Sequence, residues 1–216
     1  MTASRDSDLA AQLVAGSAEL GLPLPESQCE QLLTYLALLH KWNRVYNLTA
    51  IRQRAKWVSH HILDSLAVVR HLPPGAMVDI GTGAGLPGIP VAIAQPERSV
   101  VLLDSNHKKG AFLQQAAIEC GLRNCSVHVG RAEDWRPATR FEGAISRAFT
   151  DLTGFAEAAR GLVRPGGWLA AMKGVHPDEE LALLPSWVEV DRVIPLEVPG
   201  MRAARHLILM NLRGTG

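Results

Sequence analysis

A glycine-rich segment that follows a short apolar stretch constrains this chain more than any other feature of its sequence. Residues 77–80 are apolar apart from Asp79, and four of the next eight residues are glycines, at positions 81, 83, 85 and 88. Glycine has no side chain to keep a ligand away, so a strand, a glycine-rich turn and a helix in this order allow close backbone contact. The segment predicts a ligand site in an open α/β sheet.

The next predicted strand ends at Asp104, 19 residues after Gly85. A carboxylate there can accept hydrogen bonds from both hydroxyls of a ribose, which indicates a nucleoside cofactor. Residues 83–88 alone also satisfy the G-x-G-x-x-G pattern, so a nicotinamide dinucleotide remains an alternative. S-adenosylmethionine is favoured because Asp79 can meet a cationic amino acid moiety and because a dinucleotide-binding sheet lacks the terminal hairpin predicted below.

Short apolar runs and helical patterns alternate after residue 76, which is typical of an α/β sheet. Helices are predicted at 86–94, 108–120 and 151–163, and a short Pro-Gly-containing link at 195–205 predicts an antiparallel hairpin at one sheet edge. The expected fold is a Rossmann-like S-adenosylmethionine-dependent methyltransferase fold with a mostly parallel seven-stranded sheet. The predicted strands are 77–80, 99–104, 126–129, 143–146, 168–172, 188–194 and 206–212.

The first 70 residues are expected to form a helical extension, and residues 71–216 the methyltransferase domain. Apolar spacing predicts helices over 8–20 and from a Ser27–Glu30 capping box to about residue 44, with a third over 61–69. This extension carries an uneven charge. Residues 1–30 have a net charge of −4, whereas residues 41–70 hold six basic residues against one acidic residue, within a chain of net charge +1.

Three aromatic residues, Trp42, Tyr46 and Trp57, lie among the basic residues of this segment. Cations that meet phosphates, with aromatics that stack on unpaired bases, are what RNA recognition uses. The alternative is that Trp42 and Tyr46, four residues apart on one helix, belong to the core and that the charges form a solvated face. The sequence leaves both interpretations open.

Two further segments follow predicted strands at the edge where ligands of open α/β sheets bind. The backbone and carboxylate of Ala132 and Glu133 can meet an adenine, although Glu133 can also be a solvated loop acid. Arg147 can position a phosphate or a substrate, or serve as a surface ion-pair partner.

Several ordered blocks of this sequence resemble the bacterial small-subunit ribosomal RNA guanine-N7 methyltransferase family, also known as glucose-inhibited division protein B. The resemblance covers most of the chain. The blocks are His40-Lys41-Trp42-Asn43, Tyr46-Asn47-Leu48-Thr49, His61-Ile62-Leu63-Asp64-Ser65-Leu66, residues 81–90, Leu102-Leu103-Asp104-Ser105, Lys108-Lys109, Phe112-Leu113, Ser146-Arg147-Ala148 and Lys173-Gly174.

The resemblance implies methyl transfer from S-adenosylmethionine to N7 of a guanine, position 527, in the decoding region of 16S rRNA. By motif, Gly81 and Leu86 line the cofactor loop, Ala132 and Glu133 contact the adenine, and Arg147 lies at the active-site mouth. With the residues discussed above, the expected cofactor-binding set is Asp79, Gly81, Gly83, Gly85, Leu86, Asp104, Ala132, Glu133 and Arg147.

Substrate positioning is expected from Arg147 and Lys173. The expected RNA-binding residues are Lys41, Arg44, Arg52, Arg54, Lys56 and His61. His60 departs from the family, which usually has Arg before the matching His-Ile-Leu-Asp block, so one RNA-facing positive charge is in doubt because a neutral imidazole dominates at pH 7. His60, His61 and Asp64 have helical spacing without a further ligand cluster nearby, so no metal is expected.

The expected chemistry needs no general base, because N7 of guanine has a lone pair and no proton. None of the cysteines, Cys29, Cys120 and Cys125, follows a strand beside a proline, which disfavours methylation at cytosine C5. Methylation of exocyclic amines is disfavoured because residues 146–149 lack the Asn/Asp-Pro-Pro-aromatic pattern.

Other classes of function stay open from the residues alone: a small-molecule methyltransferase with a helical lid, a non-catalytic RNA-binding assembly factor, and a nicotinamide-dependent oxidoreductase. The N-terminal residues do not match an export signal, and an odd number of cysteines without C-x-x-C spacing suits a reducing compartment. The sequence therefore predicts a cytoplasmic protein, and we expect a monomer that binds neither DNA nor a membrane. The family resemblance implies 16S rRNA or the small ribosomal subunit as its partner.

Overall fold

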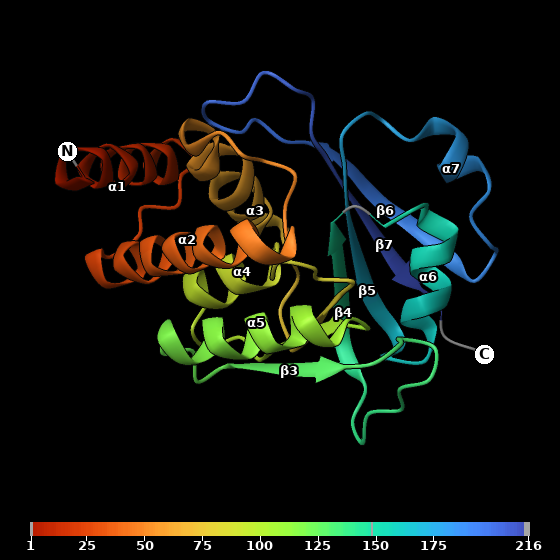
Figure 1. Cartoon of the computed structure of the whole chain (residues 1–216). Coiled ribbons are helices and arrows are strands. Elements are labelled where there is room, and N and C mark those ends of the chain that lie inside the picture. The colour runs from red at the N-terminus through yellow and green to blue at the C-terminus, as the bar shows by residue number, and fades with distance from the viewer. Residues whose placement is uncertain (1, 148, 214–216) are drawn as a thin grey trace.

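A seven-stranded sheet forms the centre of the molecule, with the strand order β3-β2-β1-β4-β5-β7-β6 (Figure 1). The computed structural model describes residues 2–147 and 149–213, with side chains from Ser7 onward, so Ala148 of the predicted 146–149 motif lies outside the described residues. The strands are β1 (Met77–Ile80), β2 (Val100–Asp104), β3 (Cys125–Val129), β4 (Phe141–Arg147), β5 (Val163–Lys173), β6 (Val188–Pro195) and β7 (His206–Leu212).

The first five strands pair in parallel, whereas β7 pairs antiparallel with both β5 and β6. The predicted fold class, including the terminal hairpin, is therefore confirmed. β5 begins five residues before its predicted start, and the helix expected over 151–163 ends at Arg160. The reason is tertiary: Val163 pairs with Phe141 of β4, so the Pro-Gly-Gly segment after it lies within a strand that its own composition disfavours.

Helices cover both faces of the sheet (Figure 1). On one face lie α4 (Gly88–Ala94) and α5 (His107–Glu119), and on the other lie α6 (Leu152–Arg160) and the short α7 (Asp178–Ala182), which the sequence did not predict. Each face buries its own cluster of apolar side chains, as expected for parallel strands that are covered on both sides.

The N-terminal helices pack onto the layer formed by α4 and α5. α1 (Thr2–Glu19) and α2 (Glu26–Tyr46) contribute apolar side chains to the same cluster as those two helices and the sheet. The side chain of Tyr35 on α2 is fully buried, and its hydroxyl donates to the carbonyl oxygen of Ala84 in the glycine loop at 2.6 Å. The N-terminal segment therefore reaches the predicted ligand loop directly.

Two predictions for this segment are wrong in detail. Ser27 does not cap α2; the helix begins at Glu26 after Pro25, and no side chain caps it. This start is physically reasonable because proline needs no amide partner there. In place of one helix over 61–69, the chain forms a π-helical turn (Val58–Leu63), the single turn α3 (Asp64–Leu66) and a 3₁₀ turn (Val69–His71). A further 3₁₀ turn (Arg54–Lys56) precedes them.

The π-helical turn directs His61 into the interior. Its side chain is 1% exposed, its Nε2 lies 3.4 Å from Thr49 Oγ1, and its Nδ1 has no hydrogen-bond partner among the described residues. Burial, with the positive charge of Arg147 nearby, lowers the pKa of His61 from 6.5 to about 4. The predicted RNA contact of His61 is therefore wrong for this structure, because the imidazole is both enclosed and neutral at pH 7.

None of the helices within residues 2–147 and 149–213 combines the length and the apolar character needed to cross a membrane.

The depressed pKa of His61 predicts an acid-dependent loss of stability. Neutral His61 stabilises the folded state fully above pH 6.5, and this contribution disappears as the pH falls toward 4. A pKa lowered from 6.5 to about 4 corresponds to about 3 kcal/mol. We therefore expect the unfolding free energy of the wild type, relative to that of His61→Gln, to fall by about this amount between pH 7 and pH 4.

Urea unfolding across this pH range measures the difference, and His107→Gln, at an exposed position on α5, is the matched control. A wild-type minus His61→Gln difference that stays constant across the range would contradict the assignment of a buried neutral imidazole.

Candidate functional site

The glycine loop between β1 and α4 leaves open space above its first half. Gly81 and Gly83 have positive φ angles of 68° and 60°, and a Cβ added at either position would have no atom closer than 3.9 Å. A Cβ at Gly85 would instead lie 2.4 Å from the Ile89 side chain, so this glycine is needed for packing against α4. The backbone at Gly81 and Gly83 is thus free to approach a ligand.

A cavity of about 280 Å³ lies over this loop, at the carboxyl edge of the parallel strands. Four of the predicted cofactor-binding residues line it together: Gly81, Asp104, Ala132 and Glu133. They come from the ends of β1, β2 and β3, which the parallel order β3-β2-β1 brings side by side. The remaining lining residues are Ile80, Leu103, Ser105, Lys109, Gly130, Arg131, Phe149 and Ala158.

The carboxylate of Asp104 is held rigidly in the cavity wall. Its Oδ2 accepts hydrogen bonds from the Gly83 amide at 2.9 Å and from Lys109 Nζ at 3.4 Å, and its Oδ1 accepts one from the Asn106 amide at 2.9 Å. A carboxylate has about four lone-pair positions, so it can still accept donors from a ligand. Backbone amides of the loop and a fixed carboxylate therefore suit the hydroxyls of a ribose.

Asp79 lies beneath the loop and does not line the cavity. Its Oδ2 accepts from Thr82 Oγ1 at 2.6 Å and from the Gly88 amide at 2.8 Å. The side chain has no exposed surface, and burial raises its pKa to about 6. The expected direct contact between Asp79 and a cationic moiety is thus not available in this arrangement. Leu86, 3% exposed, also packs into the core beneath the loop.

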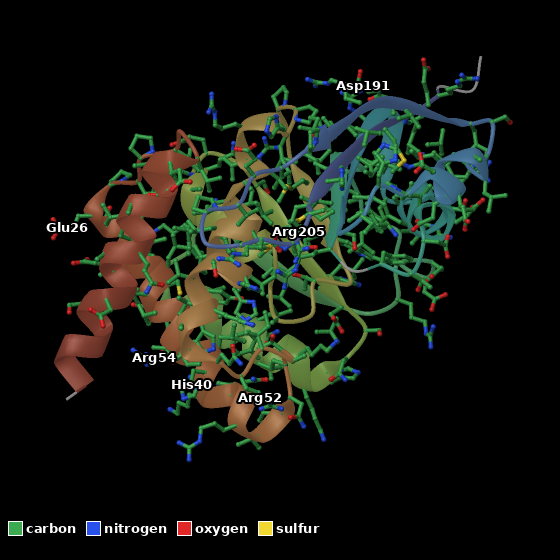
Figure 2. The ribbon with its side chains drawn as sticks, turned by 90° about the horizontal axis from the view of Figure 1, so that it is seen from above. Glu26, His40, Arg52, Arg54, Asp191 and Arg205 are labelled. Carbon is green, nitrogen blue, oxygen red and sulfur yellow. The ribbon has the colours of Figure 1, made fainter. Side chains whose placement is uncertain are left out.

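Arg147 ends β4 and points toward the N-terminal segment. Its Nη1 donates to Asp64 Oδ2 at 3.1 Å and to the His60 carbonyl oxygen at 3.2 Å. The other carboxylate oxygen of Asp64 accepts from Arg205 Nε at 2.9 Å, and Figure 2 shows Arg205 near the middle of the molecule. The side chain of Arg147 is 24% exposed, so it remains partly accessible to solvent.

Lys173, at the end of β5, is paired with Glu180 of α7 at 2.8 Å. Its Nζ also lies 3.5 Å from the carbonyl oxygen of Phe149, whose side chain lines the cavity. Glu180 in turn accepts from the Leu152 amide at 2.7 Å, at the start of α6. Lys173 therefore stabilises the cavity wall after β4 and is not a free cation.

Five predicted RNA-binding residues, Lys41, Arg44, Arg52, Arg54 and Lys56, lie on α2 and the segment after it, and all except the half-buried Arg54 are exposed. Figure 2 shows the side chains of Arg52 and Arg54 on one side of the molecule, close to His40. We name these five residues the basic surface.

The aromatic residues near the basic surface are divided between core and solvent. Trp42 donates to Gln115 on α5 and packs against Phe112, and Trp57 is 6% exposed. Tyr46 is 44% exposed and alone among the three remains open for stacking on a base. The core alternative, which concerned Trp42 and Tyr46, thus holds for Trp42 but not for Tyr46.

The sequence predicted no role for three residues of this edge: Lys109, Glu180 and Arg205. Lys108-Lys109 and Asp64 stood within blocks shared with the family, which was a signal without an assigned role. The partners Arg205 and Glu180 had no local signal, because only tertiary packing brings them to Asp64 and Lys173. Among the described side chains, no group of three or more His, Cys, Asp or Glu residues is placed to hold a metal ion.

Solved structures of low sequence similarity share the fold. An O-methyltransferase from Streptomyces achromogenes, TomG, in complex with S-adenosylmethionine, superposes with a TM-score of 0.56 at 21% identity, covering 89% of this chain and 92% of that one. An S-adenosylmethionine-dependent methyltransferase from Aquifex aeolicus gives a TM-score of 0.58 at 16% identity, covering 77% and 97%. These similarities support the methyltransferase fold alone.

Sequence relatives are much more similar. The profile of the family described as rRNA small subunit methyltransferase G matches residues 28–208. The Chromobacterium violaceum protein named Ribosomal RNA small subunit methyltransferase G is 52% identical over 204 residues, covering 94% of this chain and 98% of the relative. The protein of that name from Nitrosospira multiformis is 51% identical over 212 residues, covering 95% and 98%. This chain therefore belongs to the rRNA small subunit methyltransferase G family.

Proposed function

We propose that this protein transfers the methyl group of S-adenosylmethionine to N7 of one guanine in the decoding region of 16S rRNA. The observation that carries the proposal is the cavity at the carboxyl edge, where Gly81, Asp104 and Glu133 meet. Family membership supports a methyltransferase that acts on small-subunit rRNA, and the basic surface supports a nucleic-acid substrate.

The residues of the cavity fit S-adenosylmethionine. The open backbone at Gly81 and Gly83 accommodates the ligand, Asp104 accepts the ribose hydroxyls, and Ala132 and Glu133 meet the adenine. Asp79, Gly85 and Leu86 act indirectly in this proposal, because they shape the loop from below. The bound cofactor supplies a methyl group activated by a sulfonium.

The chain's own contribution to the reaction is orientation. Guanine N7 carries no proton, so no side chain has to act as a general base. Methylation at N7 would leave the base with the positive charge that the bound cofactor brings, so no side chain has to neutralise a charge that builds up in the site. Holding the base in line with the methyl group is then the main source of rate enhancement. Arg147, whose side chain is partly exposed, positions the RNA, and Lys173 fixes the adjacent wall.

Residues 1–70 are proposed as the RNA-contacting extension and residues 71–216 as the methyltransferase domain. The two parts share one apolar cluster, so the extension is an integral layer of the molecule. The proposal further places the protein in the cytoplasm as a monomer, with the small ribosomal subunit or its 16S rRNA as the partner and with neither DNA nor a membrane.

One labelling experiment tests the proposed function. Purified protein is incubated with radiolabelled S-adenosylmethionine and small ribosomal subunits from cells that lack this gene, and the labelled base is mapped by N7-specific cleavage. We expect label at one guanine of 16S rRNA. Label at another atom or on small molecules only would contradict the proposal, and a folded protein that does not bind the cofactor would indicate a non-catalytic assembly factor.

Asp104 and Arg147 are predicted to divide cofactor binding and RNA positioning between them. Asp104→Asn should weaken S-adenosylmethionine binding by about 10- to 100-fold, because a charge-assisted acceptor for the ribose is lost. Arg147→Ala should lower kcat/KM for the RNA by about 100-fold and change cofactor affinity less than about threefold. Cofactor titration and methylation kinetics measure both quantities, and equal losses of cofactor affinity in the two variants would refute the division.

The basic surface is predicted to contribute phosphate contacts. Replacing both Lys41 and Arg44 by Gln should weaken RNA binding. It should also reduce the slope of log Kd plotted against the logarithm of the salt concentration by about 2. Filter binding at several salt concentrations measures this change. Arg192→Gln is the control, because the neighbouring residue Asp191 lies on the other side of the molecule from Arg52 (Figure 2). An unchanged salt slope in the double variant would show that RNA binds elsewhere.

A further inference from the structure

A buried carboxylate at the carboxyl edge of the sheet holds two arginines at once. The side chain of Asp64 is only 3% exposed. Its Oδ2 pairs with Arg147 Nη1 at 3.1 Å and its Oδ1 with Arg205 Nε at 2.9 Å. Neither oxygen is left without a partner, so the ion pairs fix the carboxylate on both sides.

These three residues come from segments that are far apart in the sequence. Asp64 begins α3, Arg147 ends β4, and Arg205 lies directly before β7. Because β7 runs antiparallel to β5, its start lies at the same sheet edge as the end of β5, where Lys173 pairs with His206. The N-terminal segment, the site strand β4 and the terminal hairpin are thus joined at one point.

The electrostatics of this group depend on Asp64. Two guanidiniums flank one carboxylate, so without it two positive charges would face each other in a partly enclosed site. The side chains of Arg147 and Arg205 are 24% and 25% exposed, so both remain partly accessible to solvent. The second hydrogen bond of Arg147, to the His60 carbonyl oxygen, fixes the direction in which its free N–H groups point.

We propose that Asp64 is a positioning residue for methyl transfer, which acts by holding the guanidinium of Arg147 in the orientation that receives the RNA. Arg205 supports the same carboxylate from the opposite side. The inference rests on the proposed function, because it takes Arg147 as the residue that positions the substrate. A purely structural Asp64 would instead tie the three segments together without any specific effect on RNA.

A double-mutant cycle separates these two roles. The variants are Asp64→Asn, Arg147→Ala and the double variant, with kcat/KM for small subunits, the Kd for RNA and the Kd for S-adenosylmethionine as readouts. Asp64→Asn keeps the shape of the side chain and removes its charge. We expect it to lower kcat/KM for the RNA by about tenfold or more, with cofactor affinity within about twofold of the wild type.

Coupling is the decisive quantity. If Asp64 acts through Arg147, the Asp64→Asn change should have little further effect, within about threefold, when Arg147 is already alanine. Asp64→Glu should restore part of the lost activity, because it returns a carboxylate to the pair. Fully additive losses, or a cofactor affinity that falls as much as kcat/KM, would overturn the proposal in favour of a structural tie.

Glu142→Gln is the matched control for lost stability. Glu142 lies at the opposite end of the same strand β4, and its Oε2 accepts from the Ala76 amide at 2.8 Å. It should lower stability without changing kcat/KM per folded molecule. A loss equal to that of Asp64→Asn would contradict the proposal.

The wild type is assayed first, so that the two proposals fail separately. Label at a base other than the expected guanine, or at another atom, would contradict the proposed function. The double-mutant cycle on Asp64 and Arg147 could then still be measured with formation of that product as the readout. If no RNA is labelled, the cycle is measured on the Kd for RNA, where the same absence of coupling would overturn the role of Asp64.

Discussion

The ligand loop of this protein depends on one buried carboxylate. Asp79, inside β1, accepts hydrogen bonds from Thr82 at the start of the loop and from Gly88 at the first residue of α4. These bonds close the loop onto the strand, so that Gly83 can donate to Asp104 on the neighbouring strand. Asp79, which the sequence suggested as a ligand contact, thus stabilises the loop that forms one wall of the cavity.

The N-terminal segment belongs to the site as much as the sheet does. Tyr35 reaches the loop through the carbonyl of Ala84, and Asp64 reaches the end of β4 through Arg147. Ala84 belongs to the glycine loop, and Arg147 lies two residues before Phe149, which lines the cavity. The packing of the N-terminal helices therefore affects the position of the loop and of Arg147.

Much of the fold could be predicted because its strands carry strong local patterns. The apolar runs of β1 and β7 were predicted with their observed bounds, and the short link before β7 indicated the antiparallel hairpin. β5 was predicted too short, since its first residues are strand only through pairing with β4. The turns after α2 were mistaken for one helix, because apolar periodicity does not distinguish an α-helix from a π-helical turn.

In the candidate site, too, local sequence patterns predicted some features and tertiary contacts decided the others. Glycines after a strand and an acid after the next strand are local signals, so the sequence by itself determined the α/β class, the loop and the choice of Gly81 and Asp104. Which polar side chains face solvent depends on packing, and only the tertiary structure decided that Asp79 and His61 are enclosed and that Lys173 is paired. The physical reason is that burial and ion pairing are set by contacts between distant segments, as when Asp64 meets Arg147 and Arg205.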